Sequence, residues 1–581
     1  MVSRGTRVFS EGLPCVATAL LLTIACLALP DRAWATVEGD QTPLGEDEIA
    51  AALASGEIEV EAEGGEGVSA ASVFAAPAAF SDGFFNCFSG ADRYEVAVME
   101  AKAAYRSSDR AVIAGGEGWA DALGAAGLAG VWDCPILLTD GGSLTDCTRQ
   151  ALKDLGVSSV TIVGGPNTVS PDVEGAIKEM GISVDRIGGA DRYEVQINIY
   201  NRERAAWNND MAIIASGVNF PDALSISPVS FKDKVPIFLV DENGALNDVQ
   251  KTALGNVASA GGFSQIIIAG GPNSVSTSTE AFAESLTAAA SGGTLGVTRL
   301  GGADRFEASA NIAEWSVEKG GLSWSDPAIA MGSKPYDALC GSILQGKTGS
   351  VLMVVDPDNA NEEVYGLLEN NKSAVSSVRV FGGKESVPMT IRMDIADIFD
   401  IPYCEIPDLK VYVDAGHGQN DSNNGVFDPG ACSGGYREAD LTASLAKKVN
   451  AILNEKYGVD TFLNVDGGWY KLRAAEAKAN GCDLIVSIHF NSGGGTGTET
   501  LIHSYNEEPR SWDLQDAVHP RLIEGTTLHD RGQKRQEVAI LGGGLPATLL
   551  EIAFIDNGGD MGTYFDREDI IAEKIAEGIV G

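Results

Sequence analysis

The sequence predicts an α/β protein with three tandem α/β modules followed by one further α/β domain. Four motifs recur three times in the same order through the middle of the chain, where short apolar runs typical of buried strands alternate with helical patterns. All five histidines lie beyond this repeated region, between His417 and His529. With 581 residues, the chain is long enough for several domains.

The composition excludes one class of partner. The chain has 81 acidic and 41 basic residues, a formal net charge of −40, and 44% hydrophobic residues. It can bury cores, but the phosphates of DNA and RNA would repel it, so we expect no nucleic-acid binding. Binding to an acidic polymer would need a local basic patch, bridging cations or hydrogen bonds.

The first residues have the pattern of a secretion signal. Two arginines precede an apolar run from Val16 to Leu29, and Ala33-Trp34-Ala35 supplies the small residues that a signal peptidase needs. We expect a signal peptide over 1–35 and a secreted protein with no membrane span after cleavage. A retained membrane anchor is the alternative, which the short apolar run disfavours. The segment 36–86 is acidic and lacks Lys and Arg, which predicts a flexible linker.

Cysteine usage gives few constraints. Cleavage of the signal would leave seven of the nine cysteines, an odd number that excludes complete intramolecular pairing. Cys134 and Cys147 lie within one repeat and are a possible disulfide. No CxxC pair is present, so a thiolate zinc site is not indicated.

The repeated region has four ordered features in each copy. Each copy opens with Gly-Ala-Asp-Arg, an aromatic residue and Glu, then carries Asp-Ala-Leu, an apolar run ending in Asp, and a β-like run into Gly-Gly. The openings begin at Gly90, Gly189 and Gly302, and the Asp-Ala-Leu motifs at Asp121, Asp222 and Asp337. These signals predict βα units with parallel sheets, in repeats over 87–185, 186–297 and 298–404.

The Gly-Gly pairs and the Asp-Arg-Tyr motif of the repeats resemble functional motifs, but their sequence context favours structural roles. The Gly-Gly pairs lack a GxGxxG or GK[ST] context, so they predict tight turns rather than phosphate loops. The recurring Asp-Arg-Tyr predicts a buried structural network, because no nucleophile and base recur beside it.

These segments resemble the bacterial cell-wall-binding repeat family (type 2) over Cys87 to Cys404. The resemblance implies α/β modules that pack as a pseudo-threefold unit and anchor the protein noncovalently to anionic cell-wall polymers. The family's Pro-Ile-Leu-Leu-like element stands at Pro135 to Leu138 and, loosely, at Pro236 to Leu239. In the third copy Val351 replaces the proline.

Three residues beyond the repeats form a candidate metal site. His417 and His489 each follow a predicted buried strand, at the carboxyl end where α/β domains build their sites. Glu438 begins a helix with an apolar stripe at i, i+4, i+8 and i+11. Alone, each histidine would be structural and Glu438 would be an acid favourably placed at a helix N-terminus. Together they predict metal ligation.

A second acid completes the candidate site. Glu551 lies within the apolar run from Thr548 to Ile552, where a carboxylate is costly unless it is paired or functional. Two imidazoles, one carboxylate and an open position fit a catalytic zinc ion, which activates water and polarises a carbonyl. Glu551 would then accept the proton of the water and pass it to the leaving nitrogen.

Five motifs in this domain occur in the order of a known family. They are Val413 to Gly418, Glu438 to Leu441, Ser487 to Ser492, Asp530 to Lys534 and Leu550 to Phe554. With them, residues 408–581 resemble the zinc-dependent N-acetylmuramoyl-L-alanine amidases of the amidase-3 family. The resemblance implies zinc on His417, Glu438 and His489, with Glu551 catalytic. It also implies substrate or supporting roles for Asn491 and Arg531.

Some positions in this domain depart from the pattern or lack its context. The loop from Asn420 to Gly435 is longer than the family usually has, and its Asp428 is a rival metal ligand. The stretch from Pro509 to Leu528 predicts a helix interrupted at Pro520. The remaining histidines are predicted to be surface or structural residues: His503, His519 and His529.

Together these features predict a peptidoglycan hydrolase that cleaves the amide between N-acetylmuramic acid and L-alanine and is anchored to the cell wall by its repeats. One alternative is a zinc peptidase acting on stem peptides, because fold does not fix chemistry. Another is a non-catalytic surface-layer or adhesion protein with a degenerate amidase domain.

Overall fold

The computed structural model divides the chain into two units, residues 1–79 and 80–581. It describes residues 8–9, 59–60, 83–260, 262–291, 296–505, 508 and 510–581. Most of the predicted signal peptide and linker therefore lies outside the described residues, and β1 (Val8–Phe9) pairs antiparallel with β2 (Glu59–Val60). In the described part of the chain, no helix has the length and apolarity to cross a membrane.

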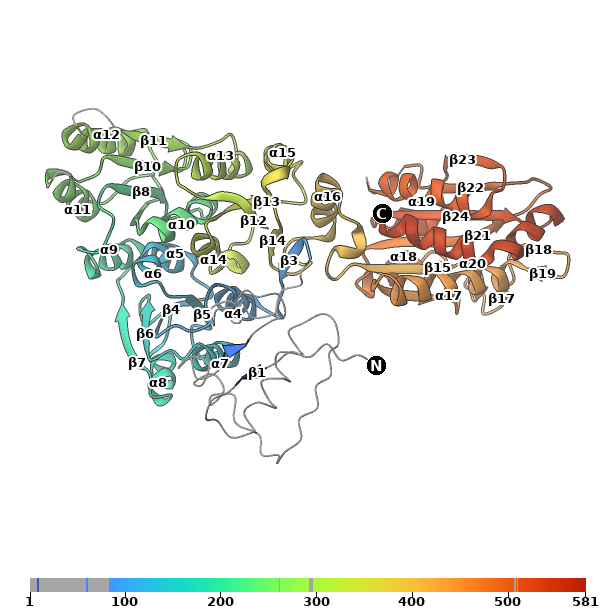
Figure 1. Ribbon diagram of the computed structural model, residues 1–581, viewed down its shortest axis with the longest axis horizontal. Coiled ribbons are helices and arrows are strands. Elements are labelled where there is room, and N and C mark those ends of the chain that lie inside the picture. The colour runs from blue at the N-terminus through green and yellow to red at the C-terminus, as the bar shows by residue number, and fades with distance from the viewer. Residues whose placement is uncertain are drawn as a thin grey trace. The chain divides into compact units, whose positions relative to one another are not determined.

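The repeated region folds into three four-stranded sheets, each parallel throughout (Figure 1). The strand orders are β5 (Ile136–Thr139), β4 (Arg110–Gly115), β6 (Ser159–Val163), β7 (Ser183–Ile187) in the first; β9 (Ile237–Val240), β8 (Met211–Ser216), β10 (Gln265–Ala269), β11 (Val297–Leu300) in the second; and β13 (Ser350–Val355), β12 (Ser323–Met331), β14 (Val378–Phe381), β3 (Phe85–Phe88) in the third. The predicted α/β class with parallel sheets is confirmed.

The start of the repeated region closes the third sheet. Strand β3 pairs in parallel with β14, with Phe85 opposite Val378. In the other two sheets, the outer strands β7 and β11 lead directly into the Gly-Ala-Asp-Arg motif of the next copy, as β3 leads into the first. Each junction between copies therefore shares a strand, and the three copies form a closed ring. Residues 85–86, expected in the linker, belong to this strand.

Helices connect the strands and join the copies. They are α4 (Arg93–Ala104), α5 (Trp119–Gly124), α6 (Ala126–Trp132), α7 (Asp146–Asp154), α8 (Pro171–Glu179), α9 (Arg192–Arg202), α10 (Pro221–Asp233), α11 (Asp248–Ser259), α12 (Thr277–Ser291), α13 (Arg305–Glu318), η1 (Tyr336–Ala338), α14 (Gly341–Thr348), α15 (Glu362–Asn370), η2 (Lys372–Ala374) and α16 (Met389–Phe399). Helices α6, α10 and α14, one from each copy, contact one another. A Cβ at Gly130 would lie 2.0 Å from the Phe231 carbonyl oxygen, so this close packing requires glycine.

The Asp-Arg motif has a structural role, as predicted, but it is an exposed helix cap and not a buried network. Its aspartates, Asp92, Asp191 and Asp304, are exposed and accept two backbone N–H groups each at the N-termini of α4, α9 and α13. The arginines that follow donate to carbonyl oxygens of Gly116, Gly217 and Gly332. The aspartates are exposed because the orphan N–H groups that they cap lie at a helix end that faces solvent.

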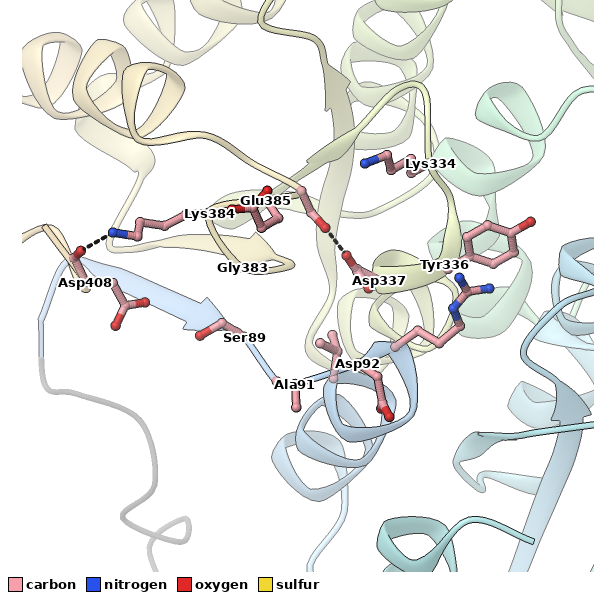
Figure 2. A pocket seen from close by; sticks show the side chains of 14 residues that line it. Ser89, Ala91, Asp92, Lys334, Tyr336, Asp337, Gly383, Lys384, Glu385 and Asp408 are labelled. Carbon is pink, nitrogen blue, oxygen red and sulfur yellow. Dashed lines mark hydrogen bonds between the residues drawn. The ribbon is translucent and has the colours of Figure 1, made fainter. Parts of the chain in front are cut away.

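Three equivalent pockets lie where a Gly-Gly turn of one copy faces the Gly-Ala-Asp-Arg motif of the next. The first glycine of each pair has a positive φ, which confirms the predicted tight turns at Gly164, Gly270 and Gly382. Figure 2 shows the pocket at the closing junction, about 540 Å³ in volume, where Lys384 Nζ donates to the Asp408 carbonyl oxygen at 2.9 Å. The Ser386 hydroxyl donates to Asp337 in this pocket.

The cysteines of the described region are free thiols, so the possible disulfide is not formed. Cys134 is buried before β5, whereas Cys147 lies in the first turn of α7, where its thiol donates to the Thr145 hydroxyl at 3.5 Å.

The C-terminal domain is built on one six-stranded sheet (Figure 1). Its order is β20 (Asp460–Asn464), β15 (Lys410–Ala415), β21 (Leu484–Asn491), β24 (Ala547–Phe554), β22 (Thr498–Ile502) and β23 (Asp530–Arg535). Only the β22–β24 pair is antiparallel within this sheet. The other elements are η3 (Tyr403–Glu405), α17 (Glu438–Glu455), α18 (Arg473–Ala479), α19 (Ser511–Thr526), η4 (Ala539–Gly542), α20 (Gly558–Val580) and the short strand pairs β16 (Gly418–Gln419) with β17 (Phe427–Asp428) and β18 (Cys432–Ser433) with β19 (Tyr436–Arg437).

Helix α19 continues through Pro520, so the predicted interruption is wrong. Pro520 and Asp516, whose carbonyl loses its partner, are both exposed. Water can therefore satisfy the group that the proline leaves unbonded.

Candidate metal centre

His417 and His489 approach each other closely at the carboxyl ends of neighbouring strands. β15 ends at Ala415, and His489 lies in β21, the strand beside it. The two imidazole ring centroids are 5.2 Å apart. A Cβ at Gly416 would lie 2.3 Å from the His489 ring, so the approach requires glycine there. His417 itself has φ +67°, and Arg473 donates to its carbonyl oxygen at 2.8 Å, which stabilises this left-handed conformation.

Glu438 is the first residue of α17 and lies between the two imidazoles. Its Oε2 is 3.2 Å from His417 Nε2, and its Oε1 is 3.1 Å from His489 Nδ1. The same oxygens accept backbone N–H groups of Ala431 and Phe490, which fix the carboxylate. Burial raises the pKa of Glu438, but hydrogen bonds from His417 and His489 outweigh it and hold this pKa below its usual value.

Two groups of potential ligands share His417. His417, Glu438 and His489 offer one ligand atom each, all within 4.8 Å of one another, and so do His417, Asp421 and Asp428. In the second group Asp421 is already paired with Arg473 at 2.7 Å. Asp428 Oδ2 lies 3.5 Å from Nδ1 of His417, the ring nitrogen that faces away from Glu438. Asp428 is therefore placed either to orient the His417 ring or to replace Glu438 as a metal ligand.

Glu551 lies in β24, in register with His489 on β21. Its Oε2 is buried, and within the described residues it has no hydrogen-bond partner. Burial raises the pKa of Glu551 to about 7. A buried, unpartnered carboxyl oxygen is costly in a folded protein, and its position beside the imidazoles supplies a chemical reason for keeping it.

Asn491 and Arg531 are connected to Glu551 by Glu499, a residue that the sequence did not single out. Glu499 on β22 is in register with Glu551, accepts from Asn491 Nδ2 at 3.1 Å, and accepts from Arg531 Nε at 2.5 Å. Lys534 also donates to Glu499. The strand that carries Glu499, Thr498 to Ile502, is buried but has only two apolar residues, Leu501 and Ile502, so its sequence lacks the apolar run that identified Glu551.

Arg473 was also missed, and its sequence context carries no signal. It lies in the polar helix α18, yet its side chain is only 3% exposed. It donates to Asp414 at 2.8 Å and to Asp421 at 2.7 Å, and so ties the long loop after His417 to strand β15.

The other histidines lie outside both ligand groups. His519 is buried between the Thr500 hydroxyl and Asp530, at 3.0 Å from each. His503 is buried and His529 is exposed.

Comparisons with known proteins agree with this division of the chain. Residues 411–580 match the family described as N-acetylmuramoyl-L-alanine amidase, and residues 88–174, 186–280 and 299–392 match cell wall binding domain 2. N-acetylmuramoyl-L-alanine amidase LytC of Bacillus subtilis is 27% identical over 509 residues, which cover 87% of this chain and 94% of LytC. The sporulation-specific N-acetylmuramoyl-L-alanine amidase of the same species is 35% identical over 157 residues, 26% of this chain and 58% of that protein. Among solved structures, Cwp6 from Clostridium difficile has a TM-score of 0.48 at 23% identity and covers 90% of this chain and 87% of Cwp6.

Proposed function

Since the chain belongs to the N-acetylmuramoyl-L-alanine amidase family through residues 411–580, and carries three cell wall binding domain 2 repeats, we propose that it is a zinc-dependent peptidoglycan amidase. His417, Glu438 and His489 would hold the zinc ion, and Glu551 would be the catalytic base. The bond cleaved is the amide between N-acetylmuramic acid and L-alanine.

One observation carries the metal assignment. Nε2 of His417 and Nδ1 of His489 converge on the two oxygens of one buried carboxylate, Glu438, at 3.2 and 3.1 Å. Two imidazoles and one carboxylate are a donor set that catalytic zinc takes, with a position left open for substrate. Asp428 near Nδ1 of His417 supplies the outer carboxylate that typically orients a zinc-binding histidine.

The bound zinc would supply Lewis acidity toward the amide carbonyl and the attacking water. Glu551 accepts a proton from that water while the water oxygen bonds to the carbonyl carbon. The carbon–nitrogen bond then breaks, and Glu551 returns the proton to the alanine nitrogen, which leaves as an amine. Because burial holds the pKa of Glu551 at about 7, the same carboxyl can both accept and donate a proton near neutral pH.

We also propose that the three repeats attach the enzyme to an anionic polymer of the cell wall, outside the cytoplasm. Their match to cell wall binding domain 2 supports this role. The chain is strongly acidic overall, so the attachment needs a local basic patch, bridging cations or hydrogen bonds. Co-sedimentation with purified walls, before and after chemical removal of their anionic polymer, tests it.

Mass spectrometry of digested peptidoglycan tests the enzymatic proposal. The mature protein should release intact stem peptides that begin with L-alanine, and both a Glu551→Gln variant and a chelated sample should release none. Products that retain the sugar–peptide amide would indicate a peptidase. Intact walls in every sample, with no zinc in the protein, would favour a non-catalytic wall-binding protein.

A further inference from the structure

A row of four side chains crosses the sheet of the C-terminal domain. His489, Glu551 and Glu499 are register partners on β21, β24 and β22, and Arg531 lies on β23, the next strand. Residues paired across neighbouring strands project from the same face, about 5 Å apart per strand. The row therefore runs from the proposed metal ligand through the proposed base to a cation whose backbone is roughly 10 Å from that of Glu551.

Glu499 fixes two cations at the end of this row. It is only 7% exposed, and its Oε2 accepts from both Arg531 Nε and Lys534 Nζ. Burial raises the pKa of Glu499, but the hydrogen bonds from Lys534 and Arg531 lower it by more than burial raises it. The net pKa is below its usual value, so the carboxylate stays charged. Two cations on one anion leave one net positive charge beside the reaction centre.

Both cations keep part of their surface for another partner. The side chains of Arg531 and Lys534 are 30% and 39% exposed. Arg531 uses Nε for Glu499 and Nη1 for the Thr496 carbonyl oxygen at 3.5 Å, and its Nη2 has no partner within the described residues. The guanidinium also lies over the Phe554 ring, 4.8 Å from the centroid, which restricts its orientation. A fixed guanidinium with a free N–H edge suits a carboxylate.

We propose that Arg531 and Lys534 bind a carboxylate of the stem peptide and so select substrates whose second residue carries a free α-carboxyl group. This inference rests on the proposed amidase function. The carboxyl group of the muramic acid is consumed in the scissile amide, so the anions near that bond belong to the peptide. A carboxylate on the second α-carbon lies about 6 Å from the scissile nitrogen, within reach of the Arg531 side chain. The peptide then crosses β22 and β23, and the glycan leaves toward β15.

Two synthetic muropeptides test this selection. They differ only in the α-carboxyl of the second residue, which is free in one and an amide in the other. We expect the full chain to cleave the free-acid form with a kcat/KM roughly tenfold or more above that for the amide. Arg531→Gln should remove most of this preference through KM, Arg531→Lys should restore part of it, and Lys534→Gln should reduce it less. Arg535→Gln is the matched control, since Arg535 lies on the same strand but stacks on Trp512 at 3.7 Å.

The ratio of the two kcat/KM values is measured within each variant, so a partly unfolded preparation does not mimic the result. Equal cleavage of both substrates by the unmodified protein, or an unchanged ratio in Arg531→Gln, would overturn the inference and leave the amidase function intact. Cleavage of neither substrate by a zinc-loaded protein would overturn both.

Discussion

Both regions of this chain bury carboxylates near the ends of parallel strands, but they surround them with different partners. In the repeats, Asp121 and its counterparts lie beneath Gly-Gly turns, so closely that a Cβ at Gly164 would be 2.8 Å from Asp121 Oδ2. In the C-terminal domain, Glu438 lies between two imidazoles and Glu551 has a buried oxygen without a partner in the described residues. We infer from this difference that the neighbours of a buried acid, rather than its burial, distinguish the proposed catalytic site from the repeats.

The pKa values alone would not have separated the two regions. Burial raises the pKa of Asp121 to about 6 and that of Glu551 to about 7, by the same cause. Only the second acid has imidazoles and a potential ligand set beside it.

The largest effect is expected on kcat, when the buried acid of each region is replaced by its amide. Glu551→Gln removes the proposed proton acceptor, so kcat should fall about 10²- to 10⁴-fold while zinc content stays unchanged. Asp121→Asn, the matched change of a buried acid in the repeats, should leave kcat unaltered. Release of new amino termini from peptidoglycan measures the rates. Equal losses in both variants would contradict the distinction between the two acids.

The next effect concerns zinc affinity. Asp428→Asn replaces the charged group 3.5 Å from His417 Nδ1, so zinc should bind about 10- to 100-fold more weakly. Competition with a fluorescent chelator measures the dissociation constant. Asp440→Asn is the control, because Asp440 is exposed and pairs with Arg437. If Asp428→Asn retains the affinity of the unmodified protein, the carboxylate does not orient His417.

A third effect is on the pH profile. The pKa of Glu551 is raised to about 7 by burial, and the base must be ionised, so kcat/KM should fall about tenfold per pH unit below that value. Initial rates across buffers from about pH 5 to 8 give the profile. A flat profile on the acid side would exclude Glu551 as the titrating base.

The smallest effect is on stability, at a buried acid with no proposed role. Glu100 of α4 occupies the position held by Ile199 in α9 and Ile312 in α13, and neither carboxyl oxygen has a hydrogen-bond partner in the described residues. Burial raises the pKa of Glu100 well above its usual value, so folding disfavours the charged form of this carboxyl. Stability from this group is therefore present at about pH 4 and lost as pH rises.

Glu100→Ile should accordingly raise the free energy of unfolding by about 1–3 kcal/mol at neutral pH, with little change at about pH 4. Urea unfolding of the full chain at both values checks this, with Glu100→Gln as a control that keeps the shape and removes the charge. A Glu100→Ile protein that is less stable than the unmodified chain at neutral pH would contradict the claim that the buried carboxyl is a net cost to folding.

Local signals in the sequence predicted the repeats and the four residues that the structure brings together around Glu438, but no local signal predicted the closing junction. At two junctions an arginine on the shared strand donates to the carbonyl oxygen of the first glycine of a Gly-Gly pair. Arg186 donates to Gly164, and Arg299 donates to Gly270. At the third junction Cys87 holds that strand position, and Arg392 donates to Gly382 from α16 instead. Because the arginine that replaces the missing contact lies on a different element, α16, a comparison of the three copies along the sequence does not reveal it.

The candidate site divides in the same way. His417, His489, Glu438 and Glu551 follow from strand ends and apolar runs. The contacts of Arg473 depend on the long loop after His417 folding back onto α18, which no local pattern specifies.

Zinc content of the full chain, measured by plasma mass spectrometry after dialysis, tests the central distinction most directly. The unmodified protein and Asp121→Asn should each retain about one zinc per chain, and Glu438→Gln should retain little, because a catalytic zinc site depends on three protein ligands. Zinc retained equally in all three proteins, or absent from the unmodified one, would contradict the assignment of His417, Glu438 and His489 as the metal centre.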